Sequence, residues 1–485
     1  MNSRKSLFVI ALVAILALSS CSGLKNKCTT NCGGSGNASL SITISDAPPT
    51  NATVVSFTLP IIGITLTPST GSPVSVFSSG NFELTRLQSD TNLVVSKKEI
   101  AAGTYTAINV TVSAPSGVFA NSSTGSFGPC PSGDFCVITG NAATITFKFS
   151  TPLTLTANAN QWLNLDFNYN NAIVSSNGAL SIDVTQTGVM TASTAVPTGV
   201  ANDAFANIDD FTGQVTAVSS SSITVKSTIR GTLTAAITSS TLFFDPLNQC
   251  SGGASLSCVQ TGSVVSVQSL LLTSGVPTAS SIDVIDAATK PTDEVEGIIY
   301  PSTCNGGSNF GMILSDSLIN TSGSPLESAS FGAGLCLTVA QISGFVVDSG
   351  ILTTQPGVPS GANIPGFQST SDILAGQMVR AKVTGATSGT NGMIDANTNT
   401  LMLRFSRLTG TINTTTGTSF SIANLPPYLG TFSVPPQVIT YINATLLEGE
   451  TSVGNLTGTV SMSSLFLNVS GGAQYWFQAA KVRQH

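Results

Sequence analysis

The sequence predicts a nearly all-β protein made of several small domains in a string. Apolar residues alternate with polar ones in many segments, and no long stretch repeats apolar residues at the spacing of an amphipathic helix. A chain of 485 residues is long enough for about three or four domains. Because 41% of its residues are hydrophobic, it can bury enough apolar surface to fold.

The alternating segments are typical of strands with one buried and one solvated face. Leu40, Ile42 and Ile44 alternate with Ser and Thr, and segments 143–149 and 163–169 alternate in the same way. We therefore expect antiparallel sheets whose polar faces lie in water.

The charge balance excludes one class of partner. The chain has 17 Lys and Arg against 23 Asp and Glu, and only 8% of its residues are charged. No excess of cations is present to neutralise phosphates, so we predict no nucleic-acid partner. Beyond the N-terminus no apolar run approaches the roughly 18–20 residues of a membrane-spanning helix.

The N-terminus has the pattern of an export signal. Arg4 and Lys5 precede an apolar stretch, Leu7 to Leu18, which is too short to span a bilayer and predicts a signal peptide over residues 1–20. Its ending, Leu18-Ser19-Ser20-Cys21, resembles the lipobox of bacterial lipoproteins. The alternative is an ordinary signal peptide followed by an accidental cysteine.

The lipobox resemblance implies that Cys21 is acylated and becomes the mature N-terminus. Each buried CH₂ of an acyl chain is worth about 0.8 kcal/mol, so two or three chains would hold the protein on a membrane. Ser22, rather than Asp, follows the cysteine, which resembles the outer-membrane sorting pattern. We expect a lipid-anchored protein of the cell envelope, in the outer membrane, on an undetermined face.

The other eight cysteines predict disulfides. They form four neighbouring pairs: Cys28 with Cys32, Cys130 with Cys136, Cys250 with Cys258, and Cys304 with Cys336. An even number of cysteines in an exported chain favours disulfides, and proximity favours these pairs. The alternative, a metal site, lacks a nearby His and any CxxC motif, so we predict no metal and no cofactor.

Residues 21–37 comprise the lipidated cysteine and a flexible tether, and a first domain follows over 38–192. Its Ser45-Asp46-Ala47-Pro48, Ala102-Gly103-Thr104-Tyr105 and Leu165-Asp166-Phe167 motifs, in this order and spacing, resemble domain of unknown function 4382. That resemblance implies a prealbumin-like or immunoglobulin-like β-sandwich on secreted and lipid-anchored proteins, without an established activity.

Three further units are predicted at 206–290, 291–405 and 406–485. Their openings, Phe211 to Val215, Val295 to Ile299 and Leu408 to Ile412, share an apolar-x-Gly pattern that resembles domain of unknown function 5666. We expect small β-barrels or sandwiches, and a loop from Thr353 to Ser371 in the middle unit.

Catalytic candidates are few. His485 is the only histidine and the last residue, so we expect a frayed tail and no catalytic triad. Carboxylates could form a glycosidase pair, although we expect them at solvated strand ends and turns. The candidate acids are Asp46, Asp166, Asp183, Asp209, Asp210, Asp293, Glu294 and Glu296.

Two other patterns have a functional and a plain interpretation. Asp395-Ala396-Asn397-Thr398-Asn399 echoes a calcium loop but carries a single charge, so a turn is favoured. Tyr475, Trp476 and Phe477 could form a glycan platform, with Tyr475 and Phe477 on one face, although core residues of a last strand are favoured.

Taken together, these observations predict a non-enzymatic cell-envelope lipoprotein that acts as a structural, adhesive or ligand-binding surface module. Its partners would be the membrane, through the N-terminal lipid, and a polysaccharide or an envelope protein. The alternative is an envelope carbohydrate-active enzyme that uses a carboxylate pair.

Overall fold

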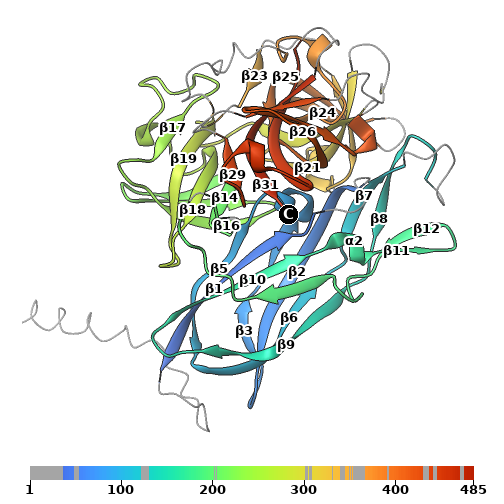
Figure 1. Cartoon of the computed structure of the whole chain (residues 1–485). Coiled ribbons are helices and arrows are strands. Elements are labelled where there is room, and N and C mark those ends of the chain that lie inside the picture. Colours follow the sequence, from blue (N-terminus) through green and yellow to red (C-terminus); the bar gives the residue numbers. More distant parts are fainter. Residues whose placement is uncertain are drawn as a thin grey trace, which may run out of the picture.

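A computed structural model describes most of the chain after the tether. The described residues are 36–48, 54–121, 130–200, 202–203, 205–300, 304, 309–329, 331–338, 344–348, 350, 352, 366–389, 393–429, 436–440, 445–469 and 475–485. The prediction of a nearly all-β protein is confirmed, because strands dominate this part of the chain (Figure 1). None of its helices is long and apolar enough to cross a membrane.

The N-terminal domain is a β-sandwich. One sheet has the order β13-β10-β1-β5, and the other has the order β8-β7-β2-β6-β9 with β3 and β4 also paired to β2. A small β11-β12 hairpin projects from one end (Figure 1). The elements are β1 Asn37–Asp46, β2 Val54–Pro68, β3 Val74–Phe77, β4 Gly80–Glu83, η1 Leu84–Gln88, β5 Asn92–Ala101, β6 Gly103–Val112, β7 Ser116–Ala120, β8 Phe135–Thr139, β9 Ala143–Leu155, β10 Asn160–Phe167, α2 Tyr169–Ala172, β11 Ile173–Ser176, β12 Ala179–Ile182 and β13 Met190–Ser193.

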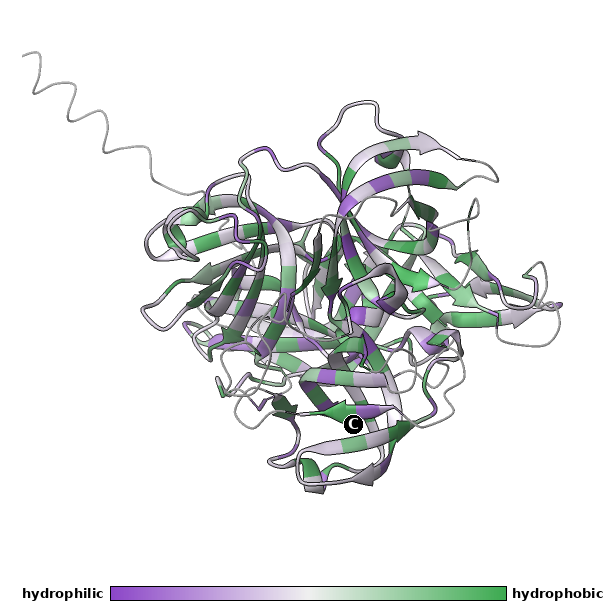
Figure 2. Cartoon of the chain, turned by 90° about the horizontal axis from the view of Figure 1, so that it is seen from above, coloured by the Kyte–Doolittle hydropathy of each residue, from purple (hydrophilic) through white to green (hydrophobic). Residues whose placement is uncertain are grey.

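The alternating residues form the sandwich core as predicted. Leu40, Ile42 and Ile44 of β1 are completely buried among apolar residues of the other sheet. Figure 2 shows apolar and polar residues alternating along many strands. Tyr105 is also buried, and its hydroxyl donates to the Ala101 carbonyl oxygen at 2.8 Å.

The expectation that the polar strand faces lie in water is wrong for the first sheet. Thr43 and Ser45 of β1 are 1% and 4% exposed, because the following domain lies over this face. The Trp162 ring of β10 packs into the core of that domain, and its indole N–H donates to the Thr273 carbonyl oxygen at 3.4 Å. Here the alternation of apolar and polar residues belongs to a sheet that is buried on both faces, one face being apolar and the other polar.

Three β-barrels follow. The first contains β14 Asn207–Val218, β15 Ser222–Ser227, β16 Gly231–Ala236, β17 Leu242–Phe244, η2 Leu256–Cys258, β18 Val264–Leu271 and β19 Pro277–Asp286. The second contains β20 Asp293–Tyr300, β21 Asn309–Leu318, η3 Pro325–Ser328, β22 Gly334–Thr338, β23 Gly344–Val347, η6 Thr370–Asp372, β24 Met378–Ser388 and β25 Ile394–Arg404. The third contains β26 Ser406–Thr415, β27 Ser419–Ala423, η8 Pro427–Leu429, β28 Gln437–Ile439, β29 Leu446–Glu448, η9 Val453–Asn455, β30 Thr459–Asn468 and β31 Tyr475–Gln484.

All three barrels have the same strand order. In the first, β16-β15-β14-β18-β19-β17 forms the sheet, and a parallel pairing of β16 with β19 closes it. The second and third repeat this order and closure with β22 on β25 and β28 on β31. A five-stranded Greek-key barrel closed by a parallel pair is the arrangement of the OB fold, with one short extra strand here. The units are barrels rather than sandwiches.

A glycine in the first strand of each barrel explains the shared sequence pattern. Gly213, Gly297 and Gly410 occupy equivalent places on β14, β20 and β26, and each of these strands has a β-bulge at the glycine or shortly after it. A Cβ at each position would collide with a carbonyl oxygen of the neighbouring strand, from Lys226, Ile313 and Ala423 respectively. Only glycine allows this close approach of two backbones.

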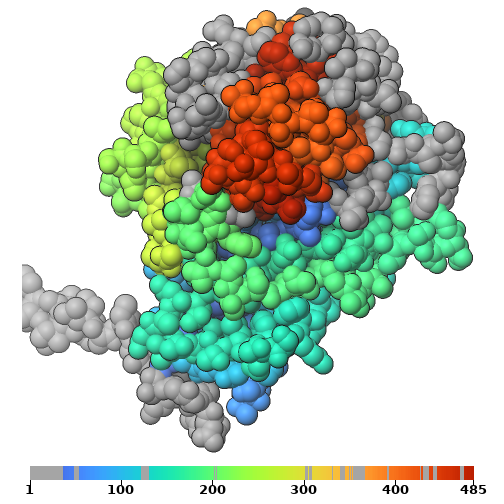
Figure 3. All heavy atoms as spheres, viewed as in Figure 1, coloured from blue at the N-terminus to red at the C-terminus, as the bar shows by residue number. Residues whose placement is uncertain are grey.

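The four domains do not form an open string. The barrels gather on one side of the sandwich (Figure 1), and in the space-filling view atoms of the first and third barrels lie directly on it (Figure 3). This packing arises because side chains of all four domains meet in a common interface.

Candidate functional site at the domain junction

One short segment of the sandwich reaches all three barrels. Residues 84–92, here called the junction segment, comprise η1 and the chain that follows it. Arg86 pairs with Glu296 of the second barrel at 2.6 Å, and Gln88 accepts from the Thr409 hydroxyl of the third at 3.0 Å. Asp90 accepts from a backbone N–H of the first barrel at 2.9 Å. In Figure 1 this blue turn lies beside the C-terminus.

Asp90 is completely buried and has two cationic partners. Its carboxylate lies 2.9 Å from the Arg230 guanidinium of the first barrel and 3.3 Å from the Lys481 ammonium of the third. Burial raises the pKa of this carboxyl, but Arg230 and Lys481 outweigh it and lower the pKa below its ordinary value. Asp90 therefore links three domains as an anion.

Glu296 is the centre of a second group of charges. Besides Arg86, its carboxylate lies 3.0 Å from Arg380 and 3.5 Å from Arg404. Burial raises the pKa of Glu296, but Arg86, Arg404 and Arg380 together lower it to about 2. Arg380 also holds Glu294, two residues away on β20, through Nε at 2.5 Å.

Other ion pairs tie the barrels to one another. Arg404 of the second barrel pairs with Asp210 of the first, whose other oxygen lies 3.3 Å from Arg407 of the third. Burial raises the pKa of Asp210, and the two arginines lower it well below its ordinary range. Within the third barrel, Arg483 and Glu448 pair at 2.7 Å.

Every arginine in the described part of the chain belongs to this network. Their side chains are 7% exposed or less, and each pairs with a buried carboxylate. Removing one partner of a buried ion pair strands the other charge and costs about 3–5 kcal/mol. The network therefore disfavours any other arrangement of the four domains.

Asp283 of β19 differs from these carboxylates because no ion pair holds it. One of its oxygens is buried without a hydrogen-bond partner. Burial raises the pKa of Asp283 to about 7; Arg404 opposes the rise, and Asp210 and Asp209 add to it. It is a buried acid that titrates near neutrality.

A narrow cavity lies where the sandwich meets the second and third barrels. Its volume is about 30 Å³, and its lining includes Glu83, Arg86, Tyr169, Arg407 and Tyr428. A sugar ring does not fit in this space. Among the described residues, no group of three or more His, Cys, Asp or Glu side chains could hold a metal ion.

Most candidate acids are buried, contrary to the expectation of solvated turns. Glu294 and Glu296 are completely buried on β20, and Asp209 and Asp210 lie at a bulge of β14. Asp293 is also buried, and it accepts from the backbone N–H groups of residues 320 and 321. They lie inside because the domains close over them.

Asp183 is the one candidate acid that caps an exposed turn, by accepting from Thr185. The two acids of the sandwich motifs lie on paired strands. Asp166 of β10 accepts from Ser45 at 2.7 Å. Asp46 of β1 accepts one long bond, 3.4 Å, from the Tyr169 backbone N–H. Burial and Asp166 raise the pKa of Asp46 well above its ordinary value.

Two interpretations at the C-terminal end are corrected. Asp395 lies in β25 rather than in a turn or a calcium loop. His485 is not a frayed tail, because its backbone N–H donates to the Thr459 carbonyl oxygen at 3.1 Å and its ring lies 2.8 Å from the Ser461 hydroxyl. Tyr475 and Phe477 both contact the Phe466 ring, as core residues would.

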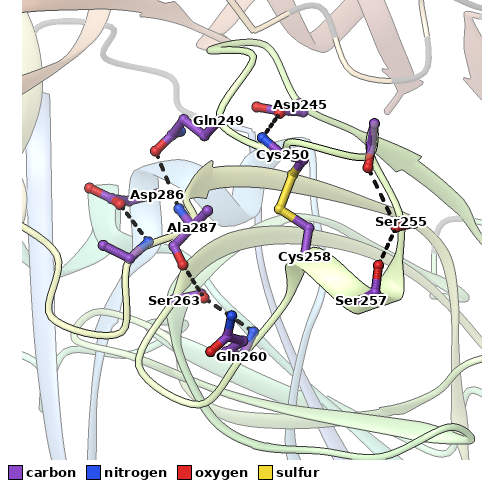
Figure 4. The surroundings of a disulfide bond; sticks show 12 residues. Asp245, Gln249, Cys250, Ser255, Ser257, Cys258, Gln260, Ser263, Asp286 and Ala287 are labelled. Atoms are coloured by element: carbon purple, nitrogen blue, oxygen red, sulfur yellow. Dashed lines mark hydrogen bonds between the residues drawn. A yellow bond between two sulfur atoms is a disulfide. The ribbon is translucent and has the colours of Figure 1, made fainter.

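Three of the predicted disulfides are present, at Cys130–Cys136, Cys250–Cys258 and Cys304–Cys336. Figure 4 shows the second, where the Cys250 backbone N–H also donates to Asp245 at 2.6 Å. Cys21, Cys28 and Cys32 lie outside the described residues.

The arginines and their role were missed by the sequence analysis. The available signal was a charged residue inside an apolar run, as in Val379-Arg380-Ala381 and Leu403-Arg404-Phe405. Charges at such positions are rarely buried unless they are paired. Which residues pair depends on the packing of separate domains, which local sequence does not encode.

The fold and the junction define an all-β protein in which a sandwich and three barrels share one ionic interface. The family described as Domain of unknown function (DUF4382) matches residues 37–184, from β1 through β12. The predicted resemblance of the N-terminal domain is thus confirmed. No curated protein matches the chain.

Proposed function

We propose that the protein is a non-enzymatic lipoprotein of the cell envelope that presents a rigid surface for binding or adhesion. The single observation that carries this proposal is the use of charge. The arginines and most candidate acids are buried and bound to one another at the junction. They hold domains together and are not accessible to a substrate.

The proposed anchor rests on the sequence of the first 21 residues. A signal peptide ending in Leu-Ser-Ser-Cys would leave an acylated Cys21 at the mature N-terminus, followed by a tether. We expect the Cys21→Ser protein to remain an unprocessed precursor or to leave the membrane fraction. Continued labelling of this variant by a fatty-acid probe would contradict the anchor.

A polysaccharide is the ligand class that best suits the barrels. OB-type barrels bind oligonucleotides or oligosaccharides, and the acidic balance of this chain disfavours the former. Many copies on one membrane would turn a weak contact into firm attachment.

The alternative, a carbohydrate-active enzyme, needs two carboxylates beside an accessible glycosidic bond. Glu294 and Glu296 are close in space, but both bind the Arg380 guanidinium and neither is exposed. A general acid also needs a raised pKa, whereas the pKa of Glu296 is lowered.

The test incubates purified protein, residues 22–485, with envelope and plant polysaccharides and measures retention and new reducing ends. We expect retention without cleavage. Turnover that disappears in Asp166→Asn or Glu296→Gln, with each variant's fold checked by circular dichroism, would favour the enzyme instead.

A further inference from the structure

The tip of the β11–β12 hairpin is an Asn-Gly turn. Asn177 and Gly178 connect the two strands, whose last residue pair is Ser176 with Ala179. Both turn residues have positive φ angles, 51° and 77°, as in a type I′ turn. They are exposed, and the hairpin projects from one end of the sandwich (Figure 1). The side-chain amide and the backbone of this turn are therefore accessible to water.

The two groups of this turn that can react with each other are both free. The Asn177 side-chain amide forms no hydrogen bond with the described residues, and neither does the Gly178 backbone N–H. Glycine has no Cβ, so no side chain of its own shields its backbone nitrogen from an approaching carbonyl carbon. Asn177 therefore precedes the least hindered backbone nitrogen that an asparagine can have.

The hairpin is held weakly at its tip. β11 and β12 form a separate two-stranded sheet with four residue pairs. An isolated hairpin is marginally stable, so its tip opens locally at little cost. Its base is fixed, because Ile182 is buried and forms a β-bridge with Gly140. Local opening lets the Asn177 side chain rotate towards Gly178 while the sandwich stays folded.

We propose that Asn177 is a site of spontaneous, non-enzymatic deamidation. The Gly178 backbone nitrogen attacks the side-chain amide carbon of Asn177, so that a C–N bond forms and a succinimide ring closes. The bond from this carbon to the amide nitrogen breaks, and that nitrogen leaves as ammonia with the proton lost by Gly178. A water molecule then opens the ring at either carbonyl and gives aspartate or isoaspartate, with no oxidation or reduction.

Either product changes the hairpin. Residues 173–182 carry no charge, so the new carboxylate makes the tip negative. Isoaspartate also adds a methylene group to the main chain, which lengthens a loop that fits two residues in a type I′ turn. The pairing of Ser176 with Ala179 is then weakened. With time the protein therefore accumulates a form whose hairpin differs in charge and shape from the newly made one.

Three other asparagines of the described residues serve as internal references. Asn158, Asn248 and Asn424 also have positive φ angles and exposed side chains. The residues that follow them, Ala, Gln and Leu, each carry a Cβ. The references thus match Asn177 in backbone conformation and exposure and differ in the residue that follows.

The test incubates purified protein, residues 22–485, in neutral and in mildly alkaline buffer. Peptide mapping by electron-transfer mass spectrometry follows each asparagine, and comparison with an aliquot that was not incubated excludes conversion during digestion. We expect Asn177 to be converted several-fold faster than the three references, with isoaspartate among the products. Conversion is expected to be faster in the alkaline buffer, because the Gly178 nitrogen attacks after losing its proton.

Gly178→Ala is the matched variant. The added Cβ meets no atom within 4 Å, so the fold accommodates it, but alanine is strained at a φ of 77° and the tip opens more readily. If opening alone set the rate, this variant would react faster. We expect it to react several-fold more slowly, because the Cβ hinders the attacking nitrogen. Conversion of Asn177 no faster than that of the references, or no slower in Gly178→Ala, would overturn the proposal.

Discussion

At the scale of single residues, this protein places its strongest charges where water is absent. Arginine suits such places, since its guanidinium can hold two carboxylates at once, as Arg380 holds Glu294 and Glu296. The exposed cations of the described residues are lysines, for example Lys97 and Lys98. Most arginine and carboxylate charges therefore form ion pairs in the interior, and the outer surface is mostly neutral and polar.

Glu296→Gln tests the centre of the network. The amide cannot compensate three guanidinium groups, so we expect the free energy of unfolding in urea to fall by about 3–5 kcal/mol. Glu327→Gln is the control, because Glu327 is exposed on η3, and exposed pairs are worth about 0–1 kcal/mol. Equal, small losses in both variants would mean that the buried pairs contribute little.

Two acids predict how stability depends on pH. The pKa of Glu296 is lowered to about 2 from 4.5, so its stabilising effect is complete above about pH 4.5 and is lost as the pH falls towards 2. The pKa of Asp283 is raised to about 7 from 3.8, so the folded state holds its proton more tightly and stability falls as the pH rises from 3.8 to 7.

We therefore expect the highest melting temperature in mildly acidic solution. Asp283→Asn removes the second effect, so its melting temperature is expected to fall less between pH 5 and 8 than that of the wild type; the raised pKa of Asp46 acts in the same direction in both proteins. A wild type that is as stable at pH 8 as at pH 5 would contradict a buried, neutral Asp283.

At the scale of elements, the local sequence predicted where the strands lie, whereas the packing of neighbouring domains determined which faces of those strands are buried. Leu40, Ile42 and Ile44 correctly indicated a strand with one apolar face. The same segment could not show that Thr43 and Ser45 would also be buried, because the first barrel that covers them is more than 150 residues away in the chain. Likewise Glu294 and Glu296 were recognised as candidates, but their arginine partners come from other strands.

The repeated glycine is an element-scale feature that sequence did reveal. Gly297→Ala would force a Cβ into the carbonyl oxygen of Ile313, so we expect it to destabilise the protein by roughly 1–3 kcal/mol or more. Gly385→Ala, in β24, is the control, since its Cβ would meet only the Asn397 amide at 3.9 Å. Similar urea midpoints for both variants would show that the second barrel tolerates a wider spacing of β20 and β21.

At the scale of the whole molecule, the junction makes four domains mutually dependent. Small domains joined by ordinary linkers unfold independently, whereas domains that share buried charges cannot separate without exposing or stranding them. A single sandwich residue, Asp90, pairs with Arg230 of the first barrel and with Lys481 of the third. The sequence predicted a string because linkers and domain lengths are visible in it, whereas a junction built from distant residues is not.

The two tryptophans allow this dependence to be measured. Trp162 belongs to the sandwich and packs into the core of the first barrel, whereas Trp476 lies in β31 of the third barrel. Trp476→Phe therefore leaves a fluorescent reporter where the sandwich meets the first barrel, and Trp162→Phe leaves one in the third barrel. With the junction intact, we expect both reporters to unfold at the same urea concentration. Asp90→Asn removes the ion-pair partner of Arg230 and leaves Lys481 with Glu448 alone, which is expected to separate the two midpoints. Glu99→Gln, at an exposed site on β5, is expected to leave them together. Distinct midpoints in the parent proteins would mean that the ion pairs position the domains without coupling their stability.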